Sequence, residues 1–365
     1  LDAADCIVDA MLGTGVTGTL REPEATAARA INATDAPVVA VDVPSGVDAD
    51  TGAAAGSAVD ADHVVTFHDT KPGLESLDTP VTVADIGIPA AAERVVGPGD
   101  LETPRRAPES HKGDHGELLV VGGGPYTGAP ALAAQAALRT GADLVHVACP
   151  ESAAPTIQGY SENLIVHSFE GDRFAPGAVD TVLDLAAEAD AVICGPGLGS
   201  HAETLTAVES FLESVDGRVV VDADALSVVP EADTDATLVC TPHQGELVGM
   251  GGETAADTDR RAELVADFAA DLGHTLLVKG DADVISDGAA TRISRTGNPG
   301  MTVGGTGDVL AGVVGALLVG REPRAAAAVG AYVNGRAGDL AFEAAGNGLV
   351  ATDLLDRLLE VFADE

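Results

Sequence analysis

The chain has 365 residues, enough for about two domains, and its hydrophobic fraction of 46% excludes a disordered chain. Asp and Glu number 58 against 19 Lys and Arg, a net charge of −39, so nucleic acids and anionic membrane surfaces would repel this chain and are excluded as general partners. No apolar run approaches the 18 residues of a membrane span, and no secretory signal pattern is present. We therefore expect a cytoplasmic protein.

The acidic excess is accompanied by a depletion of lysine. The only lysines are Lys71, Lys112 and Lys279, and there are 44 glycines and no tryptophan. This composition predicts a halophile's protein, with an ordinary acidic protein as the alternative, because concentrated salt screens the self-repulsion. The four cysteines have apolar neighbours and no CxxC spacing, so we expect reduced, buried thiols at Cys6, Cys149, Cys194 and Cys240.

Short runs rich in Val and Ile alternate with alanine-rich helical stretches along the whole chain, which is typical of an α/β fold with a parallel sheet covered on both faces. The first series of predicted strands is followed by a linker in the Pro-rich stretch 97–110, so we place one domain at 1–100, a linker at 101–110 and a second domain at 111–365. The first series comprises 6–12, 38–43, 63–67 and 81–86.

The second series comprises 117–121, 144–148, 164–169, 191–195, 218–222, 237–241 and 275–279. After these strands, residues 283–296 predict a strand pair that turns at Asp287-Gly288. Beyond Gly304 the pattern is helical, and Pro323 marks the start of a helix. No motif is shared between the two series, so no internal duplication is predicted.

The segment Gly304-Gly305-Thr306-Gly307-Asp308 opens a predicted helix. Glycines before a helix allow several backbone N–H groups to point at one anion, which the helix dipole also favours. A carboxylate beside a bound phosphate is repulsive unless it does chemistry there, such as accepting a proton from a hydroxyl that attacks the phosphoryl group. The alternative is a glycine-rich helix start in which Asp308 is an ordinary N-terminal charge.

The segment GGTGDVLAG, preceded by TGNPGM (296–301), resembles the ADP-dependent NAD(P)H-hydrate dehydratase family of the ribokinase-like superfamily. The resemblance implies that ADP phosphorylates the C6 hydroxyl of hydrated NADH or NADPH (S epimer), giving AMP, after which phosphate leaves and the dihydropyridine is restored. It covers essentially all of 111–365, because the other motifs of the family follow in order: SHKGDHGELLVVGGGPYTGAPALAAQAALRTGADLV (110–145), GPGLG (195–199), VVDADAL (220–226), TPHQGE (241–246) and LLVKGDADVI (276–285).

The resemblance implies a role for each matching residue. Asp308 becomes the general base and a substrate contact, and the other substrate contacts are Ala129, Gly197 and His243, although a lone His is more often structural. Mg²⁺ is expected to accompany the nucleotide. Glu246 and Asn298 either lie near this metal or make ordinary hydrogen bonds. Lys112 has no assigned role. The expected nucleotide contacts are Lys279, Gly280, Asp281, Ala282, Asp283, Gly305, Thr306 and Gly307, where Asp281 and Asp283 depart from the pattern by adding negative charge.

In the first domain, DAMLGTGVTG (9–18), VDVPSGVDADTG (41–52) and TFHDTKPGL (66–74) resemble the NAD(P)H-hydrate epimerase domain. The resemblance implies that Asp42 is the acid/base, that Asp9 and Ser45 hold K⁺, and that Lys71 stabilises developing charge. Alternatively, Asp42 caps the turn that follows its strand. The loop expected to wrap the diphosphate of the hydrate comprises Gly13, Thr14, Gly15, Val16, Thr17, Gly18 and Thr19.

The family's domain begins with a further loop that this sequence lacks, so we expect a truncated, incomplete epimerase and repair of the S epimer only. A homo-oligomer, with a tetramer favoured, is also implied by the resemblance.

The alternative function is a ribokinase-like small-molecule kinase of the hydroxyethylthiazole or hydroxymethylpyrimidine type. A nucleotide-sensing or scaffolding protein is a third hypothesis, which the presence of Asp308, His243 and Lys279 disfavours.

The net charge generates a prediction on salt. The melting temperature should rise steeply between dilute buffer and molar KCl, because a Debye length of about 3 Å at 1 M screens the repulsion among carboxylates. Circular dichroism melts at increasing KCl concentration measure this, with choline chloride as a control for ionic strength. A melting temperature that does not change with salt would rule out adaptation to high salt.

Overall fold

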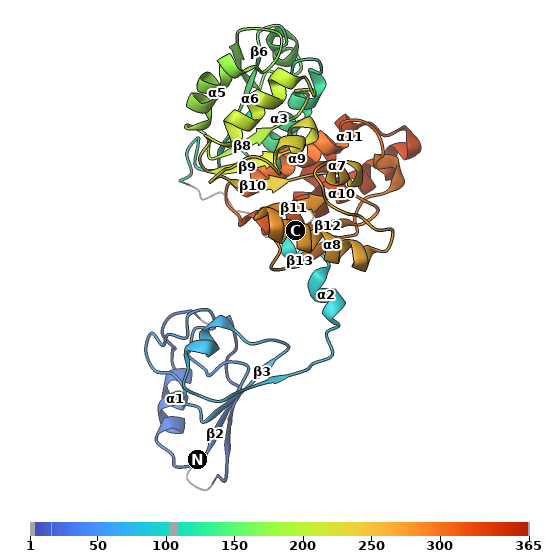
Figure 1. Cartoon of the computed structure of the whole chain (residues 1–365). Helices are drawn as coiled ribbons and strands as arrows, with labels where there is room; N and C mark the ends of the chain where they lie inside the picture. The colour runs from blue at the N-terminus through green and yellow to red at the C-terminus, as the bar shows by residue number, and fades with distance from the viewer. Residues whose placement is uncertain (1–3, 16, 102–108, 364–365) are drawn as a thin grey trace. The chain divides into compact units, whose positions relative to one another are not determined.

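The computed structural model describes residues 4–15, 17–101 and 109–363. It divides the chain into two units, Leu1–Ala92 and Glu93–Glu365 (Figure 1). The boundary lies before the predicted one: residues 93–101, which we had assigned to the first domain and the linker, belong to the second unit, where Val96 and Leu101 are buried in its core. None of the helices in the described ranges is long and apolar enough to cross a membrane.

The first unit is built on a four-stranded parallel sheet in the order β1-β2-β3-β4. One face of this sheet packs against α1 through Ala25, Ala28 and Ile31. The elements are β1 (Ile7–Asp9), α1 (Glu24–Asn32), β2 (Val38–Val41), β3 (His63–Phe67), β4 (Val81–Ala84) and α2 (Ala90–Arg94), of which α2 spans the boundary between the units.

The second unit contains a nine-stranded sheet in the order β13-β12-β11-β10-β9-β8-β5-β6-β7. The strands are parallel from β7 to β11, and β12 and β13 are antiparallel, with the turn at Asp287-Gly288 that the sequence predicted. Its strands are β5 (Glu117–Val121), β6 (Leu144–Pro150), β7 (Ile165–Phe169), β8 (Ala191–Cys194), β9 (Arg218–Val221), β10 (Thr237–Cys240), β11 (Thr275–Val278), β12 (Asp283–Ser286) and β13 (Thr291–Ser294).

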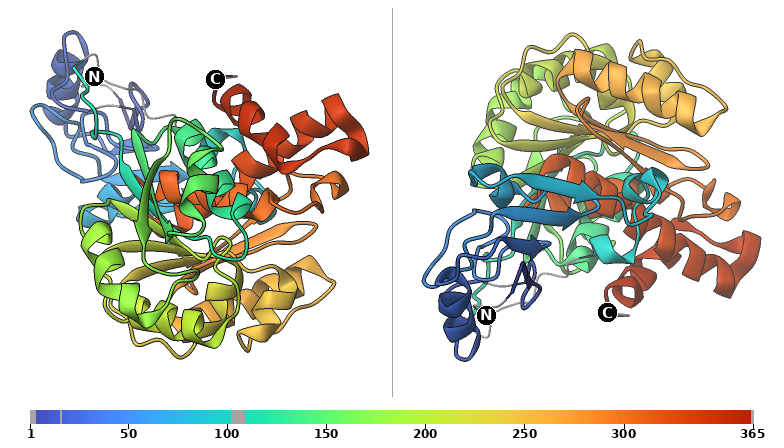
Figure 2. Two further views of the ribbon diagram at one scale, coloured as in Figure 1. Left: turned by 90° about the horizontal axis from the view of Figure 1, so that it is seen from above. Right: turned by 90° about the horizontal axis from the view of Figure 1, so that it is seen from below.

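Helices cover both faces of this sheet, as Figure 2 shows, and each face has its own buried core. The strands β8 and β11 are buried at every residue, which is why they appear in the sequence as unbroken apolar runs. One face is covered by α3 (Gly128–Thr140), α9 (Thr306–Leu318), α10 (Pro323–Ala345) and α11 (Ala351–Ala363). The remaining helices are α4 (Ala154–Gln158), α5 (Val179–Ala186), α6 (Ala202–Leu212), α7 (Gln244–Gly249) and α8 (Thr258–Leu272).

Small residues bring α9 very close to its neighbours. A Cβ on Gly312 would lie 2.1 Å from the backbone O of Ala133 in α3, and one on Gly315 would lie 2.6 Å from Ile193 of β8. Because only glycine fits at both positions, α9 is held tightly between α3 and the sheet. This packing fixes the first turn of α9, which contains Thr306, Gly307 and Asp308.

Every strand predicted from the sequence is present, although β1 is shorter than the predicted 6–12. All four cysteines are free, and Cys149, Cys194 and Cys240 are buried as predicted. The prediction was wrong for Cys6, which is exposed because it precedes the short edge strand β1. Burial raises the pKa of the Cys194 and Cys240 thiols to about 12, so both remain protonated.

Candidate active site

The carboxyl ends of five neighbouring strands, β5, β8, β9, β10 and β11, form one edge of the second sheet. Since these strands are parallel, the residues that follow them meet at this edge. The chain runs from β5 to β6 on one side, and β8 lies on the other side of β5, so the topological switch point falls between β5 and β8. In open α/β sheets this is the usual position of a ligand site.

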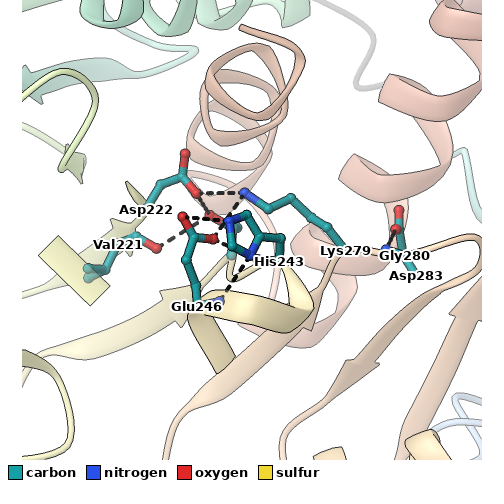
Figure 3. A network of polar contacts seen from close by, with 8 residues as sticks. Val221, Asp222, His243, Glu246, Lys279, Gly280 and Asp283 are labelled. Carbon is teal, nitrogen blue, oxygen red and sulfur yellow. Dashed lines mark hydrogen bonds and ion pairs between the residues drawn. The ribbon is translucent and has the colours of Figure 1, made fainter. Parts of the chain in front are cut away.

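An ion pair between Lys279 and Asp222 lies at this edge (Figure 3). Lys279 Nζ is 3.0 Å from Asp222 Oδ1, and the same oxygen accepts a 2.8 Å hydrogen bond from Thr241 Oγ1. The Asp222 side chain is only 4% exposed, whereas that of Lys279 is 22% exposed. Burial lowers the pKa of Lys279, but the charges of Asp222, Glu246 and Asp308 outweigh it and raise that pKa, so the ammonium stays charged.

A capping box at the start of α7 places a second carboxylate beside Lys279. Glu246 Oε2 accepts a 2.7 Å hydrogen bond from the backbone N–H of His243, and His243 Nδ1 accepts one of 2.9 Å from the N–H of Glu246. Glu246 Oε2 also lies 3.8 Å from Lys279 Nζ. His243 is thus in part a structural capping residue, but its ring is more than half exposed at the edge of the site.

The glycine-rich turn brings the start of α9 to the same lysine. Gly305 is the N-cap of α9 with φ of 100°, a left-handed conformation that favours glycine, and a Cβ on Gly307 would lie 3.2 Å from Lys279 Nζ. A helix N-terminus and an ammonium group both attract anions, so together they form a candidate phosphate site. The Thr306 hydroxyl donates to the backbone O of Met301 at 2.9 Å, so the side chain of Thr306 serves the turn.

Asp308 lies in the first turn of α9, in the same cluster of charges. Burial and the negative charge of Asp222 raise the pKa of its carboxyl to about 7, against the opposing effect of Lys279. At neutral pH this group therefore exists in comparable amounts as acid and as base, which is the condition for general acid–base catalysis. Asp308 is the titratable group of the site best suited to moving a proton.

The two predicted substrate-contact positions Ala129 and Gly197 belong to segments that touch each other at the switch point. Gly197 has φ of 74°, and a Cβ there would lie 2.3 Å from the backbone O of Tyr126 and 3.1 Å from Pro130. Ala129 is in the first turn of α3, next to Pro130. This close approach and the positive φ require glycine at position 197.

The predicted nucleotide stretch 279–283 connects β11 to β12. Each of its two additional carboxylates accepts a hydrogen bond from the protein: the exposed Asp281 accepts one of 2.7 Å at Oδ1 from Arg261 Nη2, and Asp283 Oδ1 accepts one of 2.9 Å from the N–H of Gly280. The Arg261 hydrogen bond lowers the pKa of Asp281, whereas burial raises that of Asp283 to about 6. Among the described residues, the ion pairs of Lys279 are with Asp222 and Glu246 and not with these two carboxylates.

Two residues whose roles the sequence analysis left undecided, Lys112 and Asn298, lie outside the cluster around Lys279 and Asp308. Lys112 is exposed in the segment before Glu117, where β5 begins, and the site lies at the opposite end of that strand. The Asn298 amide donates to Asp339 Oδ1 at 3.0 Å and accepts from the N–H of Gly300, so Asn298 makes plain hydrogen bonds.

Sequence reasoning missed Asp222, which pairs with Lys279, and Arg261, which pairs with Asp281. Asp222 lies in the quoted segment VVDADAL, and an acid directly after a buried strand was a usable signal for it. Arg261 lies in an ordinary amphipathic helix with several charged residues, so no pattern distinguished it from its exposed neighbours.

In the first unit, Asp42 follows β2 with a positive φ of 69°, which is uncommon for a residue other than glycine. Its Oδ1 is 2.9 Å from Lys71 Nζ and accepts a hydrogen bond from Thr66 Oγ1. Burial raises the pKa of Asp42, but the hydrogen bonds and charge of Lys71 and Thr66 outweigh it, so the net shift is downward. A Cβ on Gly13 would lie 3.7 Å from Asp42 Oδ2, so Gly13 lies beside this carboxylate.

Asp9 and Ser45 form a second cluster in this unit. Asp9 is buried, and its two oxygens each accept a 2.8 Å hydrogen bond from Ser45, one from the hydroxyl and one from the backbone N–H. The predicted pair of potassium ligands is therefore adjacent in space. Val16 of the predicted diphosphate loop lies outside the described residues.

Comparison with known proteins identifies the family. The family model described as NAD(P)H-hydrate dehydratase matches residues 118–360, which is more than half of the chain. The chain belongs to the NAD(P)H-hydrate dehydratase family. A second family model, the YjeF-related protein N-terminus, matches residues 1–73.

The alignments with curated relatives cover both units of this chain. The bifunctional NAD(P)H-hydrate repair enzyme Nnr of Pyrobaculum aerophilum is 46% identical over 98% of this chain and 74% of its own length, and that of Methanothermobacter thermautotrophicus is 44% identical over 98% and 72%. The ADP/ATP-dependent NAD(P)H-hydrate dehydratase of Bacillus subtilis, co-crystallised with ATP/Mg²⁺, is 27% identical with a TM-score of 0.62, covering 72% of this chain and 94% of that one.

The match to residues 1–73 corrects one expectation. We expected the epimerase function of the first domain to be lost or incomplete, but the domain itself is present. The clusters around Asp42 and Asp9 are formed within the described residues of the unit. The absence of the family's first loop, which the sequence analysis expects, stays a prediction.

The charges around Asp308 generate a prediction for this member of the dehydratase family. The Asp308 carboxyl should titrate near pH 7, and Asp222→Asn should lower its midpoint because a nearby negative charge is removed. Carbon-13 NMR titration of the aspartate carboxyls measures both values, and the exposed Asp224→Asn is the matched control. An Asp308 midpoint near 4 in the unmodified chain would contradict the prediction.

Proposed function

We propose that the second unit catalyses the ADP-dependent dehydration of the S epimer of hydrated NADH or NADPH. The observation that carries this proposal is the position of Asp308, a carboxyl with a pKa of about 7, in a helix start that reaches Lys279. The family and the relatives support the same activity. The enzyme is accordingly a lyase of metabolite repair.

In the proposed reaction, Asp308 accepts the proton of the C6 hydroxyl as that oxygen forms a bond to the β-phosphorus of ADP, and the bond to AMP breaks. The electron pair of the ring nitrogen then expels phosphate from C6, and a proton leaves C5. The products are NAD(P)H, AMP and phosphate. Because the carboxylate is the reactive form, the rate of phosphoryl transfer should rise with pH through about 7.

Lys279 and the N-terminus of α9 are proposed to hold the transferring phosphoryl group, with the backbone of Gly305, Thr306 and Gly307 around it. The 279–283 stretch would bind the rest of the nucleotide. The hydrated ring would lie at the switch point, against Ala129, Gly197 and His243. This arrangement directs the ring hydroxyl toward Asp308 and the phosphoryl group, and proximity of this kind lowers the barrier.

Mg²⁺ is expected with the nucleotide, as in the Bacillus relative. Within the described ranges no group of three or more acidic, His or Cys side chains forms a metal cage. This fits Mg²⁺, which commonly takes one or two carboxylates together with substrate phosphates and waters. Glu246, whose side chain is partly exposed beside Lys279, would hold it, and the ion would neutralise phosphate charge.

A small-molecule kinase of the ribokinase-like type is the alternative function, because the same phosphate site and base serve both reactions. The phosphorylated product distinguishes them. A kinase releases its phosphorylated substrate, whereas the dehydratase releases AMP and inorganic phosphate and restores absorbance of the dihydropyridine. Incubation with hydrated NADH and either ADP or ATP, followed by product analysis, tests the proposal directly.

The first unit supports a second activity, interconversion of the two C6 epimers of the hydrate. Asp42 would be the acid/base, because Lys71 and Thr66 hold its carboxylate beside Gly13 of the predicted diphosphate loop. Asp9 and Ser45 would contribute two neighbouring oxygens to K⁺, which would stabilise negative charge there. The match to the YjeF-related model favours this activity.

The finer properties of the protein are also proposals. Adaptation to high salt rests on the net charge of −39 and the three lysines. A homo-oligomer, with a tetramer favoured, and a cytoplasmic location rest on the resemblance and on the substrates, which are nucleotides of central metabolism. Sedimentation in buffered KCl measures the oligomer directly.

Replacement of the proposed base gives the first mechanistic prediction. Asp308→Asn should lower the dehydration rate about 10²–10⁴-fold, because the loss of general-base catalysis has this size. ADP binding should persist, since the substitution removes a negative charge from the phosphate site. Turnover is followed by dihydropyridine absorbance and ADP binding by calorimetry. A variant that keeps most of its turnover would exclude Asp308 as the base.

The role of Lys279 is tested by Lys279→Ala. The Kd for ADP should rise roughly 10- to 100-fold, as expected for the loss of a charged hydrogen bond to phosphate, while the KM for the hydrate changes less. Lys112→Ala is the matched control, because Lys112 is exposed at the far end of β5. Equal losses for the two ligands, or none for either, would contradict the assignment.

The epimerase activity is tested with a hydrate mixture enriched in the R epimer. The intact chain should consume the R epimer faster than its spontaneous conversion, and Asp42→Ala should abolish this acceleration. Consumption of the S epimer should be the same in both proteins, which controls for folding of the second unit. If the intact chain leaves the R epimer to spontaneous conversion, the first unit has no epimerase activity.

A further inference from the structure

The 279–283 stretch has an electrostatic difficulty as a nucleotide loop. Asp281 and Asp283 flank Ala282 within four residues of Lys279, so a bound diphosphate would approach two carboxylates. Like charges at short range are repulsive and would oppose binding. Some feature of the fold has to offset the charge of these carboxylates for the loop to bind a diphosphate.

Arg261 of α8 donates hydrogen bonds to two residues of this loop. Its side chain is 2% exposed, and its Nη2 donates to Asp281 Oδ1 at 2.7 Å and to the backbone O of Ala282 at 3.0 Å. Its Nη1 donates to the backbone O of Ala255 at 3.3 Å. The guanidinium group thus lies beneath the loop and joins two of its residues to the segment before α8.

The remaining contacts fix the two ends of the loop. The N–H of Lys279 donates to the backbone O of Pro242 at 2.8 Å, and the N–H of Gly280 donates to Asp283 Oδ1 at 2.9 Å (Figure 3). A Cβ on Gly280 would lie 3.1 Å from the backbone O of Ala282 and 3.4 Å from Arg261 Nη2. The loop is therefore narrow, and Arg261 fixes the position of its middle residues, Asp281 and Ala282.

We propose that Arg261 is a positioning residue for nucleotide binding: from within the core it pairs with the exposed carboxylate of Asp281 and holds the backbone of Ala282, so that the charge of Asp281 is offset and the loop is fixed with Lys279 available to the diphosphate. The inference rests on the proposed function, because it takes 279–283 as the nucleotide loop. Arg261 itself touches no ligand, since it is almost completely buried.

Arginine suits this position better than lysine. Its planar group donates to a carboxylate and to a carbonyl from one nitrogen and to a second carbonyl from another, whereas an ammonium is a point charge on a flexible stem. The Nε of Arg261 has no hydrogen-bond partner among the described residues. A buried donor without a partner costs stability, so the packing of the core alone does not account for an arginine here.

The test compares ADP binding in four variants of the full chain by calorimetry without hydrate. Arg261→Met should raise the Kd for ADP at least about tenfold, and Arg261→Lys should have an intermediate effect. Arg260→Met is the matched control, because Arg260 is exposed on the same helix and pairs with Glu263. It should bind ADP as the unmodified chain does. The KM for the hydrate at saturating ADP should stay within twofold in all of them.

Asp281→Asn is the fourth variant, and it provides the sharpest outcome because the two possibilities differ in sign. If Arg261 positions the loop through Asp281, loss of this ion pair should raise the Kd for ADP about twofold to fivefold, as for an exposed pair. If Asp281 only repels phosphate, the same change should tighten ADP binding. Unchanged or tighter binding would overturn the proposal, and this variant keeps its buried arginine should Arg261→Met not fold.

Failure of the inference and failure of the proposed function can be told apart. If the unmodified chain binds ADP and does not dehydrate the hydrate, the proposed function is wrong while the binding measurements still decide the role of Arg261. If the chain dehydrates the hydrate and Arg261→Met loses affinity for hydrate and ADP alike, with a lower melting temperature than Arg260→Met, Arg261 is merely structural and the proposal is wrong.

Discussion

The ammonium of Lys279 is held at the carboxyl ends of three neighbouring strands by the buried carboxylate of Asp222, and most of the site is arranged around this ion pair. Withdrawing two such charges from water costs several kcal/mol, and the pair is tolerated because Thr241 and Glu246 add partners. An ion pair of this kind is weak evidence for stability. Its role here is to hold the ammonium of Lys279 beside the first turn of α9.

The same pair sets the chemistry of Asp308. Asp222 raises the pKa of the Asp308 carboxyl and Lys279 lowers it, and burial adds the largest shift, so the result lies near 7. The position of α9 depends on Gly312 and Gly315, where any side chain would collide with α3 or β8. The proton-accepting group is therefore fixed by contacts that lie one to two helical turns away from it.

The loop between β11 and β12 contains two carboxylates that would oppose the binding of a phosphate, and the fold supplies a hydrogen-bond donor to each of them. Its acids appear in the sequence as departures from the pattern of the family, and the structure turns each of them toward an internal donor, Asp281 to Arg261 and Asp283 to the N–H of Gly280. The charge of Asp281 is thus offset by a cation, and the carboxylate of Asp283 is stabilised by a backbone donor. In a chain with net charge −39, such local arrangements decide where an anionic ligand can approach.

The sequence by itself determined the strands, the two α/β units and the family, because buried parallel strands appear as unbroken apolar runs and the glycine-rich motifs have a required backbone geometry. It also singled out Asp308, Lys279 and Asp42 as the residues able to do chemistry. Only the tertiary structure decided that Asp222 partners Lys279, that Arg261 lies under the loop and that Asn298 is occupied by Asp339. These contacts join residues 20 to 57 positions apart, and no local pattern encodes which distant side chain will pair with a given charged or polar group.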